Sequence, residues 1–146
     1  MKGIERYVMN GRNALVIGAL AGMLAVALGA FGAHALKDRL MASGRLDTYD
    51  LAVEYQFYHA LALLITGLVI QRESNGQLRA AAWCFVVGIL VFSGSLYILA
   101  VLDVPMAGAI TPVGGTAFIA GWLLLALGVS KKKRSQRDLR DDIGSR

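Results

Sequence analysis

Residues 13–36 read NALVIGALAGMLAVALGAFGAHAL and contain no Asp, Glu, Lys or Arg. An α-helix rises about 1.5 Å per residue, so a helix of this length crosses the roughly 30 Å hydrocarbon core of a bilayer. Backbone groups inside lipid have no water to bond and must pair within their own segment. We therefore expect a transmembrane helix at residues 13–36.

Three further apolar runs follow, at about residues 52–71, 80–102 and 112–129. Asp103 and Pro105 are expected to end the third run, and Thr111 and Pro112 to be the N-cap and first helical residue of the fourth. The pattern predicts an all-α membrane protein with four transmembrane helices in one compact bundle. This domain covers residues 13–129, between an N-terminal tail at residues 1–12 and a basic tail at residues 130–146.

The composition agrees with a membrane protein. The chain of 146 residues is 56% hydrophobic and 17% charged, below the roughly 25% that is usual for soluble domains. Seven of the 15 basic residues lie after residue 130, directly behind an apolar run, so we assign them to topology and to anionic lipids rather than to nucleic acid. Cys84 is the only cysteine, which excludes an internal disulfide.

The distribution of Lys and Arg predicts the orientation. With four spans, the two tails and the loop at residues 72–79 share one side and hold 12 of the basic residues, whereas the other two loops hold three. The positive-inside rule then places both termini in the cytoplasm. Ala33-His34-Ala35 resembles a signal-peptidase site, but the apolar run before it is longer than a secretory leader, so we expect it to be retained.

The first span carries a line of small residues at Gly18, Gly22, Ala25 and Gly29. Small residues allow helix backbones to approach closely in lipid. The line has two interpretations, which the sequence does not separate: packing within the bundle of one chain, or the interface of a homo-oligomer.

The second span has two different faces. At about 100° per residue, one arc holds Tyr55, Tyr58, His59, Ala62 and Thr66, and the opposite side holds Phe57, Leu61, Leu64 and Leu68. We expect the first face to meet the other helices and the second to meet lipid. With the predicted orientation, the uncharged polar residues of all four helices lie in the outer half of the membrane. The candidate cluster is His34, Tyr55, Tyr58, His59, Ser93, Tyr97 and Thr111.

His59 has a functional and a structural interpretation. An ionisable residue inside a span is a candidate functional group, but a histidine that bonds a neighbouring helix also fixes packing. Because His59 is expected to lie deeper than His34, we predict that His59→Ala perturbs the protein more than His34→Ala.

Four stretches of the chain are similar to a known family. GAFGAHALKDRL from Gly29, VEYQFYHALAL from Val53, FSGSLYILA from Phe92 and ITPVGGTAFIAGWLLLA from Ile110 resemble the domain-of-unknown-function 423 family, which is related to animal transmembrane protein 256. The resemblance runs from about residue 18 to residue 127. It implies a small four-helix protein of the bacterial inner membrane, and it implies no catalytic residue.

Four classes of function remain open at this point. The small size and small-residue lines favour a non-enzymatic accessory, assembly or scaffold protein, within a larger complex or as a homo-oligomer. A small transporter or channel that uses the polar cluster around His59 is the alternative, although the spans bury no carboxylate. Haem held by the two histidines is a lesser alternative, opposed by their different depths. We expect no cofactor and no metal, and no catalytic constellation or nucleotide motif suggests an enzyme.

Overall fold

The computed structural model describes residues 9–130, and within them it is helical and has no strand. The elements in chain order are α1 (Gly11–His34), α2 (Lys37–Ala42), α3 (Leu46–Arg72), α4 (Gly76–Gly88), the π-helical segment η2 (Ile89–Ser93), α5 (Gly94–Leu102) and α6 (Pro105–Ser130). The segments α4, η2 and α5 continue one another as a third span, Gly76–Leu102. With α1, α3 and α6 this makes four helices long and apolar enough to cross a membrane.

Asparagine side chains cap the N-termini of two of these helices, α1 and α4. The Asn10 side chain accepts a hydrogen bond from the backbone N–H of Asn13 (2.8 Å), and Asn75 accepts one from Leu78 (3.0 Å). Both bonds satisfy a donor that the first turn of a helix leaves without an intrahelical partner. Asn75 also donates to the carbonyl of Gly128 (3.0 Å), so one residue starts α4 and fastens the end of α6.

The start of the fourth span differs from the prediction. α6 begins at Pro105, and Thr111 and Pro112 lie inside it, so their assignment as its N-cap and first residue was wrong. Pro105 occupies the helix start, where its missing N–H costs nothing. Pro112 removes one interior hydrogen bond, which transmembrane helices tolerate when neighbouring groups compensate.

Other boundaries also move outward from the predicted runs. α3 begins at Leu46 rather than near residue 52, and the third span begins at Gly76 rather than at residue 80. These added turns carry charged residues such as Asp47 and Arg79, which a search for uncharged runs leaves out. The short helix α2 was not predicted.

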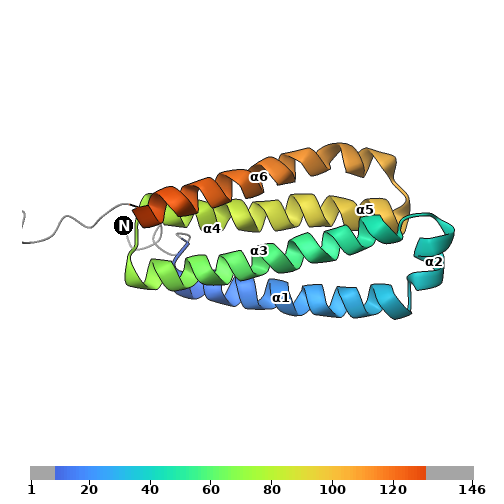
Figure 1. The fold of residues 1–146 in the computed structure, drawn as a ribbon, viewed down its shortest axis with the longest axis horizontal. Coiled ribbons are helices and arrows are strands. Elements are labelled where there is room, and N and C mark those ends of the chain that lie inside the picture. Colours follow the sequence, from blue (N-terminus) through green and yellow to red (C-terminus); the bar gives the residue numbers. More distant parts are fainter. Residues whose placement is uncertain (1–8, 131–146) are drawn as a thin grey trace, which may run out of the picture.

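The long helices lie side by side in the order α1, α3, third span, α6 (Figure 1). The described chain starts and finishes at one end of the bundle, here called the termini end, and α2 lies at the other, the α2 end. α3 packs along α1 on one side and against the third span on the other, whereas α1 makes at most slight contact with the third span or α6. α1 is therefore attached to the molecule through α3.

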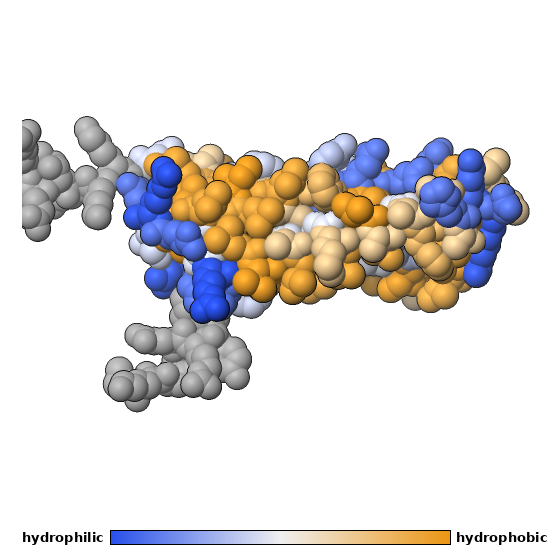
Figure 2. All heavy atoms as spheres, turned by 90° about the horizontal axis from the view of Figure 1, so that it is seen from below, coloured by the Kyte–Doolittle hydropathy of each residue, from blue (hydrophilic) through white to orange (hydrophobic). Residues whose placement is uncertain are grey.

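The surface is apolar around the middle of the bundle. Figure 2 shows hydrophobic residues over most of one long face, with hydrophilic residues gathered toward both ends. Helices in a bilayer expose apolar side chains to lipid and carry charged groups near the headgroups. The arrangement is the one expected for four helices that cross a membrane together.

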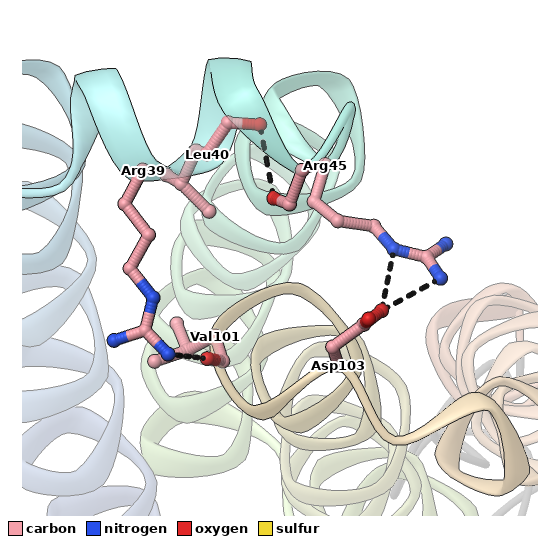
Figure 3. A network of polar contacts seen from close by, with 6 residues as sticks. Arg39, Leu40, Arg45, Val101 and Asp103 are labelled. Atoms are coloured by element: carbon pink, nitrogen blue, oxygen red, sulfur yellow. Dashed lines mark hydrogen bonds and ion pairs between the residues drawn. The ribbon is translucent and has the colours of Figure 1, made fainter.

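The α2 end is closed by polar contacts across the loops (Figure 3). The Arg39 side chain donates from Nη2 to the carbonyl of Val101 (2.8 Å), one of the carbonyls that the end of α5 leaves unpaired. Arg45 pairs with Asp103 (3.0 Å), which turns the chain out of α5 in the left-handed conformation (φ 52°). Leu40, the buried residue of α2, packs toward the bundle. These contacts hold α2 over the ends of the spans.

Candidate functional site

His59 lies on α3 and is buried, with 6% of its surface exposed. Its Nε2 is 3.3 Å from Nε1 of Trp122, and its Nδ1 is 2.7 Å from the carbonyl oxygen of Tyr55. An indole N–H can only donate, so Nε2 is the acceptor and Nδ1 carries the proton that is donated to Tyr55. The imidazole is thus neutral and uses both nitrogens within the bundle.

Aromatic rings surround this histidine. The His59 ring stacks on Phe118 with centroids 3.4 Å apart and planes 11° apart, and Tyr55 stacks on Phe92 with centroids 4.6 Å apart. A cavity of about 520 Å³ opens beside them between α3 and α6. Its lining is Tyr55, Tyr58, His59, Phe92, Gly115, Phe118, Ile119 and Trp122. The histidine therefore interlocks α3 with α6.

A second polar group connects α3 with α1 and α5, and its centre is Gln56. The buried Gln56 amide donates from Nε2 to the carbonyl of Ala21 (2.9 Å) and accepts at Oε1 from the Tyr97 hydroxyl (3.0 Å). Two turns nearer the α2 end, the Tyr49 hydroxyl donates to the carbonyl of Leu28 (2.8 Å). Polar side chains that bond between helices stabilise packing in lipid, where the hydrophobic effect does not.

A third contact joins α5 and α6. The hydroxyls of Ser95 and Thr111 are 2.8 Å apart, and Ser95 also donates to the carbonyl of Phe92 (2.9 Å). Ser93 is buried at the end of η2, and its hydroxyl has no hydrogen-bond partner within residues 9–130. Thr111 thus serves as a contact between helices from a position well inside α6.

The predicted cluster is divided by the structure. Tyr55 and His59 face α6, Tyr97 bonds through Gln56 toward α1, and Thr111 meets Ser95. His34 is exposed at the last residue of α1 and joins none of these groups.

The prediction for the faces of α3 is confirmed for most residues and wrong for two. His59, Ala62 and Thr66 are buried, while Leu61 and Leu68 are exposed. Phe57 is also exposed. Leu64 was expected to meet lipid, but it is half-buried and packs on Gly18 of α1. Tyr58 was expected to face the other helices, but 54% of its surface is exposed. It lies on the border between the two faces, where a small rotation of the helix decides the outcome.

Three residues that the sequence did not single out complete these groups. Gln56, Trp122 and Tyr49 supply the partners of Tyr97, His59 and the Leu28 carbonyl, respectively. An uncharged amide in the middle of an apolar run was a usable signal for Gln56, because such a group needs a partner in lipid. Trp122 was hidden, because tryptophan is ordinary in a membrane helix.

The two histidines are not placed for a shared ligand. Gly32 is two residues before His34 and packs on the ring of Tyr49, so the end of α1 lies level with Tyr49 of α3. His59 lies about 15 Å further along α3 than Tyr49. His34 is exposed, and both nitrogens of His59 are hydrogen-bonded. Within the described residues, no group of three His, Cys, Asp or Glu side chains is placed to hold a metal. The geometry does not favour bis-histidine haem ligation.

The small-residue line of α1 packs against α3. A side chain added at Gly18 would meet Leu64 and the carbonyl of Ala60, and one added at Gly29 would meet Val53. Ala25 is fully buried, and Gly22 faces Ala60. Packing within one chain therefore accounts for this line without a second copy.

Comparison with known proteins places this geometry in a family. The family model described as "Protein of unknown function (DUF423)" matches residues 28–115, more than half of the chain. The chain belongs to the DUF423 family. The matched segment contains the Gln56–Tyr97 and His59–Tyr55 hydrogen bonds. Trp122, the other partner of His59, lies beyond it.

Relatives in several bacteria are similar over most of their length. A UPF0382 membrane protein of Staphylococcus saprophyticus is 45% identical over 80% of this chain and 96% of its own. The UPF0382 membrane protein YwdK of Bacillus subtilis is 41% identical over 80% and 95%. The UPF0382 inner membrane protein YgdD of Escherichia coli is 37% identical over 86% and 95%. No solved structure matches. The chain is an integral, multi-pass membrane protein.

Proposed function

We propose that this protein is a non-enzymatic accessory component of a larger membrane assembly. We place it in the bacterial plasma membrane with both termini in the cytoplasm, because of the distribution of Lys and Arg and because the Escherichia coli relative is named an inner membrane protein. The basic tail at residues 131–146, which would face anionic lipids, lies outside the described residues.

The observation that carries the proposal is the position of Glu54 and Tyr58. Inside the bundle, His59, Gln56 and Tyr97 are paired with other helices. Glu54 and Tyr58, by contrast, are exposed one turn apart on the outer surface of α3. A carboxylate on the outer surface of a membrane helix is costly unless it lies at the headgroups or meets a partner.

The surface around these two residues suits a partner helix. A cavity of about 510 Å³ lies beside them between α1 and α3, and the small residue Ala30 is exposed at its wall. Small residues permit close approach of another helix, and a Lys or Arg on that helix would pair with the Glu54 carboxylate. Transport is less well supported, because the buried His59, Gln56 and Tyr97 side chains are already hydrogen-bonded within the bundle.

The test is native mass spectrometry of the tagged protein, extracted in mild detergent at its natural expression level. We expect a complex of fixed stoichiometry with another membrane protein, which Glu54→Gln and Tyr58→Phe weaken. Asp50→Asn is the matched control, since it removes an exposed carboxylate one turn nearer the α2 end of α3. A chain that is recovered alone, or only as a homo-oligomer, would contradict the proposal. Solute flux in liposomes would then be the next measurement.

A further inference from the structure

The other side of α1 bounds a groove of a different kind. Because α1 and the third span both pack on α3 but scarcely touch each other, a cavity of about 370 Å³ runs between them. On α1 it extends from Ile17 to Leu28, about 16 Å along the helix. Its lining is almost wholly apolar, and the Gln56 and Tyr97 groups in its wall are already bonded to each other.

A cation lies just beyond one mouth of this groove. Leu28 and Tyr97 line it toward the α2 end, and Val101 is one turn, about 6 Å, further along α5 than Tyr97. Arg39 starts from α2, which follows α1, and reaches the Val101 carbonyl. Its guanidinium therefore bridges the ends of the two helices that bound the groove.

This guanidinium keeps donors for another ligand. Figure 3 shows one terminal nitrogen of Arg39 directed at Val101 and the other directed away from it. Arg39 is exposed, and so is Lys37 on the same short helix. The nearby Arg45 differs, because its guanidinium is paired with Asp103. Arginine binds phosphate strongly when two of its N–H groups face the anion.

We propose that this groove and Arg39 form a binding site for an anionic phospholipid. One acyl chain lies in the groove between α1 and the third span, and the phosphate bonds to Arg39 at the α2 end. Basic side chains beside a groove between membrane helices are suited to anionic lipid headgroups. The proposal uses the side of α1 away from Glu54, and it stands or falls independently of the accessory function.

The test is native mass spectrometry of the full-length protein, delipidated in detergent and titrated with palmitoyl-oleoyl phosphatidylglycerol or with phosphatidylcholine of the same acyl chains. We expect phosphatidylglycerol to bind more tightly. Arg39→Gln is expected to weaken its binding about tenfold, with little effect on phosphatidylcholine. The proposal would be overturned if Arg39→Gln bound phosphatidylglycerol as tightly as the wild type does.

Arg12→Gln is the matched control for the headgroup. Arg12 lies on α1 beyond the opposite mouth of the groove, at the termini end. We expect this variant to bind phosphatidylglycerol as the wild type does. If Arg12→Gln weakens binding and Arg39→Gln does not, the headgroup lies in the other leaflet and the proposed site is wrong.

Gly94→Leu tests the acyl chain. Gly94 lines the groove, and a Cβ built on it meets nothing within 4 Å, so a leucine at this position adds its side chain to the groove. Gly76→Leu is its control, because Gly76 also faces open space but lies outside the groove. We expect only Gly94→Leu to abolish the tight lipid site. Leu24→Trp fills the groove from α1 and repeats the test if Gly94→Leu does not fold. Unchanged lipid binding in a folded filling variant would overturn the proposal.

Discussion

The attachment of α1 to α3 and the attachment of α6 to the rest of the bundle use glycine in two ways. At the termini end of α1 and α3 the backbones approach: a Cβ on Gly11 would lie 2.7 Å from the carbonyl oxygen of Gly67, and one on Gly67 would lie 3.0 Å from that of Gly11. Only nearer the α2 end does a glycine of α1, Gly32, receive a large ring, that of Tyr49. Between the third span and α6, glycines mostly receive large side chains. Gly121 faces Phe85, Gly128 faces Leu78, and Gly88 faces Phe118.

This difference explains why the two sides of α3 look unlike each other. The α6 side is an interlocked aromatic core that includes His59, Phe118 and Trp122. The α1 side is a narrow seam, supported by two side chains that bond to carbonyls of α1. α1 therefore keeps most of its circumference for lipid or for a partner. Variants that add or remove one contact test the aromatic core on the α6 side and the narrow seam on the α1 side.

The largest effect is expected where a glycine meets backbone on the α6 side. A side chain at Gly114 would overlap the backbone of Phe92, which cannot rotate away. We expect Gly114→Leu to destabilise the protein by about 3 kcal/mol or more, measured as the midpoint of unfolding in detergent. Gly115→Leu is the control, since its Cβ would lie 3.8 Å from the Phe92 ring. Equal stability of the two variants would contradict this contact.

The next effect concerns the two histidines. His59→Ala removes the stack on Phe118 and leaves the Trp122 N–H without its acceptor, and we expect a loss of about 2 to 3 kcal/mol. His34→Ala alters an exposed residue, so its effect is expected within about 0.5 kcal/mol. Detergent thermal denaturation compares the two, and equal or reversed losses would refute the ranking.

A smaller effect is expected on the α1 side. Gln56→Leu removes the bond to Ala21 and the acceptor of the Tyr97 hydroxyl, at a cost of about 1 kcal/mol. A double-mutant cycle with Tyr97→Phe measures the coupling between the two side chains, which we expect to be clearly different from zero. Strictly additive losses would mean that the amide and the phenol do not interact.

The smallest effect is expected at the α2 end. The Arg45–Asp103 pair is solvent-exposed, with the Asp103 side chain 68% accessible, so Arg45→Gln should cost less than about 1 kcal/mol. The difference from wild type should shrink in high salt, because ions screen exposed charges. A loss that is large and independent of salt would show that the pair holds the loop more firmly than its exposure suggests.

The four spans could be predicted from the sequence because a long uncharged run in lipid must form a helix to pair its backbone groups. The sequence pattern missed α2, where Lys37, Asp38 and Arg39 break the apolar pattern in a segment too short for a clear period. It placed the start of α6 at Pro112, because proline marks a helix start in water more reliably than in a membrane. The π-helical turn at Ile89–Ser93 carries no local marker.

For the candidate site, the sequence identified several bonded residues but not their grouping. Tyr97 and Thr111 were chosen for polarity and depth, yet their partners Gln56 and Ser95 are set by how the helices rotate against each other. Tyr58 was assigned to the wrong face for the same reason. Pairing between helices depends on tertiary packing, which one helix's periodicity does not contain.

The central claim is that the small-residue line of α1 packs on α3 of the same chain. A Cβ on Gly22 would lie 3.9 Å from the Cβ of Ala60, within the range that a disulfide requires. The most direct measurement is oxidation of Gly22→Cys/Ala60→Cys in a Cys84→Ser background, followed by intact mass and non-reducing electrophoresis. We predict a monomer that has lost two hydrogens. A disulfide-linked dimer, or two free thiols, would contradict the account.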